Sequence, residues 1–148
     1  MKIILCWVGK TKDTHIQEGI KKYLTFLRPY ASVEVVEIKE EKGTLPVEEI
    51  KAREGQRILR QVNDFILLDE TGQQFSSVEF ARFLKSFESG TVRFVIGGCY
   101  GTSDAVHKGA KAILSLSRLT LTHEISRLIL LEQLYRAFTI IHNKKYHY

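Results

Sequence analysis

Short apolar runs alternate along the chain with longer stretches in which apolar residues recur every three or four positions. The runs are rich in Val, Ile, Leu and Phe, a composition typical of buried strands, and the longer stretches have helical spacing. The pattern therefore predicts helices separated by five strands, at Lys2–Val8, Val33–Ile38, Phe65–Leu68, Val92–Ile96 and Ile113–Leu116.

Capping residues and prolines indicate where the helices begin and end. The signals are Asp13 or Thr14 as a first cap, Pro29 just beyond a helix end, Pro46 in a first turn, and Ser76 with Glu79 at capping-box spacing. The second helix runs toward Gln61, and Glu70-Thr71-Gly72 is expected to turn the chain after the third strand. We also expect a short helix from Asp104 toward Lys111 and a final helix from about His123 to Ile141.

The alternation of strands and helices predicts an α/β fold, with a mainly parallel sheet and helices on both faces. A chain of 148 residues without a linker or repeat is expected to form one domain over residues 1–148. Physical reasoning alone favours a plain doubly wound sheet, because knotted chains are rare.

Composition and charge are those of an ordinary globular protein. The chain is 44% hydrophobic and 26% charged, and its net charge of +5 permits an anionic partner such as nucleic acid without requiring one. Cys6 and Cys99 lie far apart and have neither a disulfide framework nor zinc-ligand spacing. No run approaches the roughly 20 apolar residues of a membrane span. We therefore expect a cytoplasmic protein that binds neither metal nor membrane.

Two strand ends close together in the sequence suggest a ligand site. A Gly-rich turn, Gly97-Gly98-Cys99-Tyr100-Gly101, follows one strand, and a hydroxyl-rich loop follows the strand Ile113–Leu116. Ligands of open α/β sheets bind at the carboxyl ends of strands. The turn lacks the spacing and position of a dinucleotide-binding loop. Taken alone, it fits a tight strand-to-helix connection as readily as a ligand loop.

The final helix is apolar on almost all sides, which indicates burial on more than one side. It fits either the centre of a monomer or a contact with a second subunit, and Leu130 or Leu131 could face that partner. Glu132 and Arg136 are four residues apart and suited to an ion pair. The basic, aromatic tail that follows is either a solubilising end or an RNA contact, since aromatic rings stack on unpaired bases.

Several motifs resemble one known family. They are LLDETG (Leu67–Gly72), SSVEFA (Ser76–Ala81), FVIGGCYG (Phe94–Gly101), LSLSRLTL (Leu114–Leu121), HEISRLILLEQLYRAFTI (His123–Ile140) and the pair Tyr146-His147. They resemble the pseudouridine N3-methyltransferases of large-subunit ribosomal RNA, a small family of the SPOUT superfamily. The likeness covers essentially the whole chain, and RLILLEQLYRA is its most specific string. This chain has Thr122 and Lys145 where the family usually has proline.

The resemblance implies a C-terminal deep trefoil knot, a homodimer whose site is completed across the interface, and S-adenosylmethionine as cofactor. It implies that the cofactor is held by Leu68, Gly97, Leu116, Ser117, Arg118, Leu119, Thr120 and Leu121. It also implies that the substrate is large-subunit ribosomal RNA, in assembled ribosomes. His147 is then the candidate base for the N3 proton and Tyr146 the residue that stacks on or hydrogen-bonds the target base, although both could serve only to position RNA.

Two other interpretations fit the same residues. One is a SPOUT methyltransferase that acts on another RNA, such as transfer RNA. The other is a non-catalytic RNA-binding or ribosome-binding factor. Saturable binding of S-adenosylmethionine distinguishes the enzyme from the binding factor.

Overall fold

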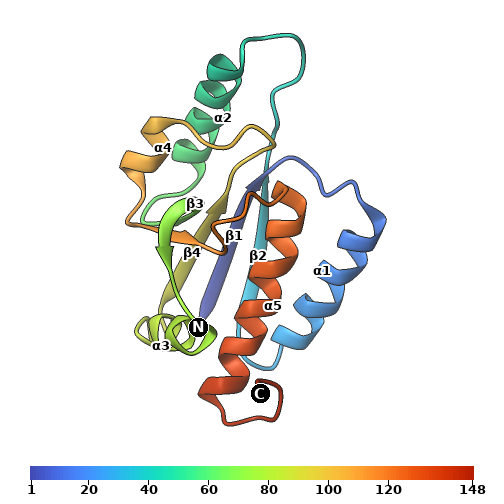
Figure 1. Ribbon diagram of the computed structural model, residues 1–148, viewed down its shortest axis with the longest axis vertical. Helices are drawn as coiled ribbons and strands as arrows, with labels where there is room; N and C mark the ends of the chain where they lie inside the picture. Colours follow the sequence, from blue (N-terminus) through green and yellow to red (C-terminus); the bar gives the residue numbers. More distant parts are fainter.

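A computed structural model describes all 148 residues, in which five strands and five helices alternate strictly along the chain (Figure 1). In order they are β1 (Lys2–Val8), α1 (Thr14–Leu27), β2 (Ser32–Ile38), α2 (Val47–Gln61), β3 (Ile66–Gln74), α3 (Ser77–Lys85), β4 (Thr91–Ile96), α4 (Asp104–Gly109), β5 (Ala112–Ser115) and α5 (His123–Ile141). The strands form one sheet in the order β2-β1-β4-β3-β5. Every neighbouring pair of strands is parallel, as the alternation predicts.

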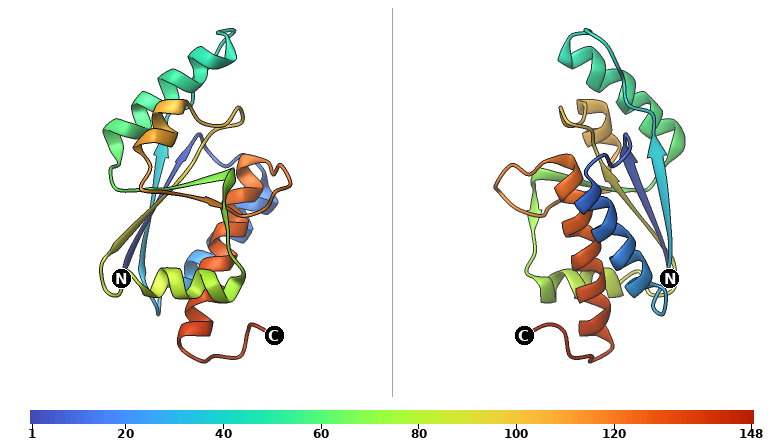
Figure 2. Two further views of the ribbon diagram at one scale, coloured as in Figure 1. Left: turned by 60° about the vertical axis from the view of Figure 1, so that its left-hand side comes forward. Right: turned by 90° about the vertical axis from the view of Figure 1, so that its right-hand side faces the viewer.

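Helices cover both faces of the sheet, which confirms the predicted α/β architecture (Figure 2). Alternate residues of β1 enter two separate cores: Ile3, Leu5 and Trp7 pack with α1, α3 and α5, and Cys6 and Val8 pack with α2 and α4. This division follows from the side-chain alternation of a strand. Helix α5 lies between α1 and α3 on the larger core, so its apolar residues are buried against the sheet and both neighbouring helices.

The predicted caps form at the helix starts. Asp13 Oδ1 accepts hydrogen bonds from the backbone N–H groups of His15 (2.8 Å) and Ile16 (3.2 Å). Ser76 and Glu79 make the reciprocal capping box of α3. Thr122, which stands where proline is usual in the family, caps α5 by accepting from the Ile125 N–H at 3.2 Å. The hydroxyl therefore stabilises the helix start that borders the loop after β5.

Strand β3 is longer than its apolar run predicts. The turn expected at Glu70-Thr71-Gly72 is wrong, because these residues continue β3 and the pairing with β5 shifts register between Leu68 and Gln73. A Cβ on Gly72 would lie 2.6 Å from the carbonyl carbon and oxygen of Ile113. Glycine thus permits the close approach of the β3 and β5 backbones. The local sequence does not reveal this tertiary contact, because its composition is that of a turn.

None of the helices is both long enough and apolar enough to span a membrane. The trefoil knot stays a prediction that follows from the family resemblance. At the end of α5, the chain turns back and the tail lies against the C-terminal half of that helix, away from the carboxyl edge of the sheet (Figures 1 and 2).

Candidate functional site

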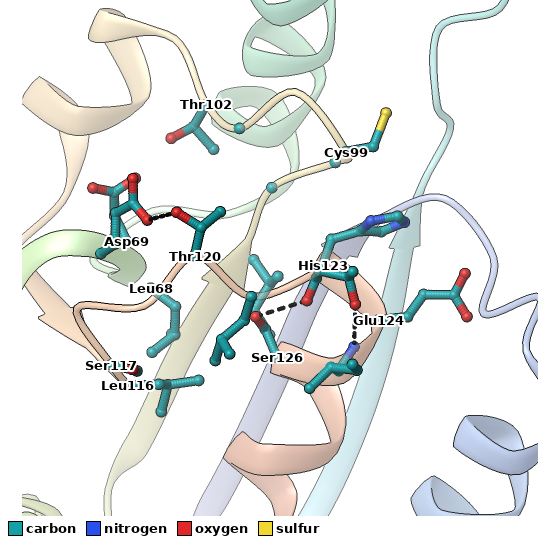
Figure 3. A pocket seen from close by; sticks show the side chains of 18 of the residues that line it. Leu68, Asp69, Cys99, Thr102, Leu116, Ser117, Thr120, His123, Glu124 and Ser126 are labelled. Atoms are coloured by element: carbon teal, nitrogen blue, oxygen red, sulfur yellow. Dashed lines mark hydrogen bonds between the residues drawn. The ribbon is translucent and has the colours of Figure 1, made fainter.

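A pocket of about 720 Å³ opens where β3 and the loops after β4 and β5 meet the start of α5 (Figure 3). Three segments supply most of its wall: Leu68–Glu70 of β3, the Gly-rich turn after β4, and the loop between β5 and α5. They lie side by side at the carboxyl edge of the sheet, because β3 lies between β4 and β5 and its pairing with β4 ends at Leu68. The pocket lies where the sequence predicts a ligand site.

The Gly-rich turn is shaped by its glycines. Gly101 has φ +85°, and its N–H donates to the carbonyl oxygen of Gly98 at 3.1 Å, which closes a tight turn that bears Tyr100. A Cβ on Gly97 would lie 2.6 Å from Thr102 Cγ2 and 3.1 Å from the Gly101 carbonyl. The missing side chain at Gly97 therefore makes room for the turn itself, and no ligand is needed to explain this glycine.

Hydrogen bonds fix the loop between β5 and α5 at several points. Ser115 Oγ donates to the carbonyl of Ser117 at 2.9 Å, and Ser117 Oγ accepts from the N–H of Leu119 at 3.0 Å. The hydroxyl of Thr120 donates to Glu70 Oε2 at 2.7 Å, which ties this loop to β3 across the pocket. The hydroxyl-rich composition is thus used to hold the wall in place.

The structure brings seven of the eight predicted cofactor residues to the pocket wall: Leu68, Gly97, Leu116, Ser117, Leu119, Thr120 and Leu121. Arg118 is exposed and is not part of that wall, although both of its neighbours are. Successive residues of an extended loop point in different directions, so a contiguous motif does not place every side chain in one cavity.

Sequence reasoning missed the part of the wall built by α1 and the start of α5. Glu124 Oε1 accepts hydrogen bonds from the N–H groups of Lys12 (2.9 Å) and Asp13 (3.0 Å), so the first turn of α5 holds the start of α1. Asp13 and Ile16 of α1 thereby join His123 and Glu124 on the wall. The one available signal was that His123 opens the motif His123–Ile140 by which the chain resembles the family.

Arg127 reinforces this arrangement from inside the protein. It is fully buried, and it donates to the Val8 carbonyl at 2.6 Å and to Thr11 Oγ1 at 2.9 Å while lying over the Trp7 ring. Burial lowers its pKa to about 10, against the opposing attraction of Glu124, so the guanidinium stays charged at neutral pH. Arg127 therefore links α5 to the end of β1 and to the loop that leads into α1.

The pocket wall is acidic. Asp13, Asp69, Glu70 and Glu124 line it, and no lysine or arginine does. Burial favours the protonated form of Asp69, but hydrogen bonds from Thr71 and the nearby His107 outweigh it, and the pKa of Asp69 is lowered. His107 Nε2 lies 3.5 Å from Asp69 Oδ1. The field in the pocket favours a ligand that carries positive charge.

The predicted catalytic pair lies elsewhere in the same chain. Tyr146 is half-buried, and its hydroxyl lies 3.1 Å from Glu132 Oε1 and 3.5 Å from the Tyr23 hydroxyl. His147 Nδ1 lies 3.2 Å from Arg136 Nη1, and the expected pair of Glu132 with Arg136 forms. These contacts lie in the middle and C-terminal half of α5, whereas the pocket is at its start. At a helical rise of about 1.5 Å per residue, Glu132 lies roughly 14 Å and Arg136 roughly 20 Å along the axis from His123.

The pocket fits S-adenosylmethionine in size and chemistry. Its volume is within the range of roughly 300–1,000 Å³ that small-molecule sites occupy. Leucine and isoleucine side chains from these three segments can flank a planar ring, and the acidic wall suits a ligand with a sulfonium and an ammonium group. No cluster of three or more His, Cys, Asp or Glu side chains has the arrangement of a metal site.

A parallel sheet with a pocket at its carboxyl edge defines an α/β domain of the type that binds nucleotide-like cofactors. The family described as predicted SPOUT methyltransferase matches residues 1–147. A relative from Thermodesulfovibrio yellowstonii, named ribosomal RNA large subunit methyltransferase H, is 53% identical over 141 residues, covering 95% of this chain and 94% of its own. A relative of the same name from Geotalea daltonii is 44% identical over the full length of both chains.

The fold is shared with a solved structure, a probable methylase family protein from Haemophilus influenzae. The two agree with a TM-score of 0.56 at 12% identity, over 99% of this chain and 70% of the other. With the sequence matches, this completes the assignment: the chain belongs to the SPOUT methyltransferases and, within them, to the ribosomal RNA large subunit methyltransferase H family.

Proposed function

We propose that this protein uses S-adenosylmethionine to methylate N3 of a pseudouridine in large-subunit ribosomal RNA. The observation that carries the proposal is the acidic pocket of about 720 Å³, because seven residues expected to hold the cofactor converge on it from β3 and two separate loops. The relatives that share its whole length are named as methyltransferases of that RNA.

When bound, S-adenosylmethionine supplies an electrophilic methyl group. The residues that would hold its adenosine are those of the wall shared by β3, the Gly-rich turn and the loop after β5. Leu116 and Leu121 exclude water from that wall, and the backbone of the two loops offers hydrogen-bonding groups. The carboxylates of Asp69, Glu70 and Glu124 favour the positively charged part of the ligand.

The proposal includes a homodimer, because Tyr146 and His147 contact Glu132 and Arg136 of their own chain and do not line its pocket. Two copies whose α5 helices run antiparallel would place the tail of one beside the pocket of the other. The outward strip of α5 supports such a contact: Ile125 is 41% exposed, and Ile129 follows it at helical spacing. Leu130 and Leu131 are fully buried within the protomer, so they do not form this surface.

His147 can serve as the base only after the tail rearranges. An arginine nitrogen can only donate, so His147 Nδ1 accepts from Arg136 and the ring proton of the neutral form is on Nε2. Neither nitrogen is then free to accept a proton from N3 of the target base. We infer that RNA binding draws the tail away from Arg136, which releases the lone pair of Nδ1.

Tyr146 is proposed to stack on or hydrogen-bond the target base and not to remove its proton. Burial, followed by the hydrogen bonds to Tyr23 and Glu132, raises the pKa of its phenol. The hydroxyl therefore stays protonated at neutral pH and is suited to donation. In the free chain, the ring packs edge-on against Tyr135 with a centroid distance of 4.8 Å, which keeps it ordered.

Ribosomes isolated from cells that lack this protein provide the test. Incubation with the protein and S-adenosylmethionine labelled in its methyl group should transfer the label to one pseudouridine of the large-subunit RNA, identified by nucleoside mass mapping. Ribosomes with uridine at that position are the matched control and should remain unlabelled. Transfer to transfer RNA instead, or saturable cofactor binding without transfer to any RNA, would reject the proposed substrate. We place the reaction on assembled ribosomes, and hence in the cytoplasm.

A further inference from the structure

We propose that Tyr100, Arg118 and Leu119, together called the rim, receive the unpaired RNA strand around the target nucleotide. The inference deepens the proposed function, because it assigns a substrate contact at the mouth of the same pocket. Tyr100 stacks on a base, Leu119 packs against the same or the neighbouring base, and Arg118 pairs with a backbone phosphate. The rim belongs to the protomer that holds the cofactor, and so it is separate from the C-terminal tail.

The rim exposes apolar side chains that the fold does not need. Leu119 is 75% exposed and Tyr100 is 52% exposed, and among the exposed large hydrophobic residues only Tyr148 is more exposed than these two. Both residues border the pocket, Tyr100 on the turn after β4 and Leu119 on the loop after β5. Two exposed apolar groups on separate loops of one opening make a surface suited to a planar base.

This exposure is built into the loops. The Gly98–Gly101 hydrogen bond closes the turn that carries Tyr100, and Gly101 has a positive φ of 85°. Leu119 is held from both sides, since its own N–H donates to Ser117 Oγ and the adjacent Thr120 donates to Glu70. The two side chains are therefore presented to solvent by fixed backbone, as a preorganised recognition surface requires.

Charge divides the opening into two parts. The pocket wall has four carboxylates and no lysine or arginine, so it disfavours the phosphate of a nucleic acid. Arg118 lies immediately outside that wall, is exposed, and makes none of the ion pairs of the chain. An unpaired guanidinium at the same opening as an exposed aromatic ring matches the combination of phosphate and base that single-stranded RNA offers. The arrangement thus favours a cationic cofactor inside and RNA at the rim.

The test uses full-length protein and ribosomes that lack the modification. Tyr100→Ala and Leu119→Ala remove the apolar surfaces, and Tyr100→Phe is the matched variant that keeps the ring. Arg118→Ala removes the cation, and Arg60→Ala is its control, because Arg60 is an exposed arginine in the last turn of α2. For each variant, the measurements are the KM for ribosomes at several salt concentrations, the affinity for S-adenosylmethionine by calorimetry, and the sedimentation coefficient.

Tyr100→Ala should raise the KM for ribosomes by about 5- to 150-fold, the range that loss of base stacking implies, and Tyr100→Phe should stay near the wild type. Leu119→Ala should raise it by a smaller factor. Arg118→Ala should reduce the salt dependence by about one phosphate contact, a change of roughly 0.7 in the slope of log KM against log salt. Arg60→Ala should leave the slope unchanged. Cofactor affinity should match the wild type in the Tyr100 and Arg118 variants, and sedimentation should match it in every variant.

Three outcomes would overturn the proposal. A parallel loss of cofactor affinity would assign the rim to the cofactor, and a change to monomer would assign it to a contact between two copies of the chain. Unchanged KM and salt dependence in the Tyr100 and Arg118 variants would show that RNA does not touch the rim. If the wild type itself transfers no methyl group to ribosomes, the proposed function fails first, which is a distinct result.

Discussion

Gly97→Ala offers a sharp test of how the cofactor loop is built. The added Cβ would lie 2.6 Å from Thr102 Cγ2 and 3.1 Å from the Gly101 carbonyl, well inside normal contact distance. Overpacking of this kind costs roughly 1–3 kcal/mol of folding free energy and displaces the backbone of the turn. We expect urea denaturation to show a loss in that range, and calorimetry to show weaker binding of S-adenosylmethionine.

The structure also predicts a rescue. Thr102→Ser deletes the methyl group that the new Cβ meets first, at a cost of about 0.8 kcal/mol by itself. In the double variant that contact disappears and only the milder one with Gly101 remains. The two changes should therefore couple favourably by roughly 1–2 kcal/mol in a double-mutant cycle of unfolding free energies.

Gly101→Ala is the matched control. A Cβ at Gly101 meets nothing within 4 Å, and the cost there comes from its φ of +85°, about 1–2 kcal/mol. Thr102→Ser should not relieve it. If Thr102→Ser rescues Gly101→Ala as well as Gly97→Ala, or rescues neither, the steric explanation for Gly97 is wrong.

Three further predictions address the dimer, the tail and pH. Ile129→Glu should give a monomer in sedimentation at micromolar concentration with an unchanged circular dichroism spectrum; a dimer would refute the antiparallel α5 contact. Deletion of Lys145–Tyr148 should abolish methyl transfer to ribosomes while calorimetry still detects cofactor binding, and wild-type transfer would remove the tail from the site. Burial and then the positive charge of Arg127 lower the pKa of His123, so its contribution to stability is present above about pH 6.5 and is lost as pH falls through the folded-state pKa. His123→Gln should therefore flatten the decline in unfolding free energy as pH falls below about 6.5; an equally steep decline would contradict that assignment.

Local signals in the sequence were enough to predict the elements and most of the pocket. Asp13 and the pair Ser76 and Glu79 cap helices through side chains that reach backbone only two or three residues away, so their effect can be read from spacing alone. The two strand-end loops meet because carboxyl ends of parallel strands share one edge of a sheet. The strand–helix alternation predicted that geometry before any distance was known.

Contacts between distant residues decided the rest. Gly72 continues β3 only because the backbone of Ile113, 41 positions away, lies against it, and its local sequence is indistinguishable from that of a turn. Arg127 is a charged residue in an otherwise apolar helix, and the sequence does not show which groups it hydrogen-bonds. Its partners, Val8 and Thr11, are more than 100 residues away in the chain. The separation of Tyr146 from the pocket depends on the length and direction of α5 within the assembled layers. The sequence by itself determined which segments become strands, helices and ligand loops; tertiary packing decided where single side chains point, because that depends on neighbours the local pattern does not contain.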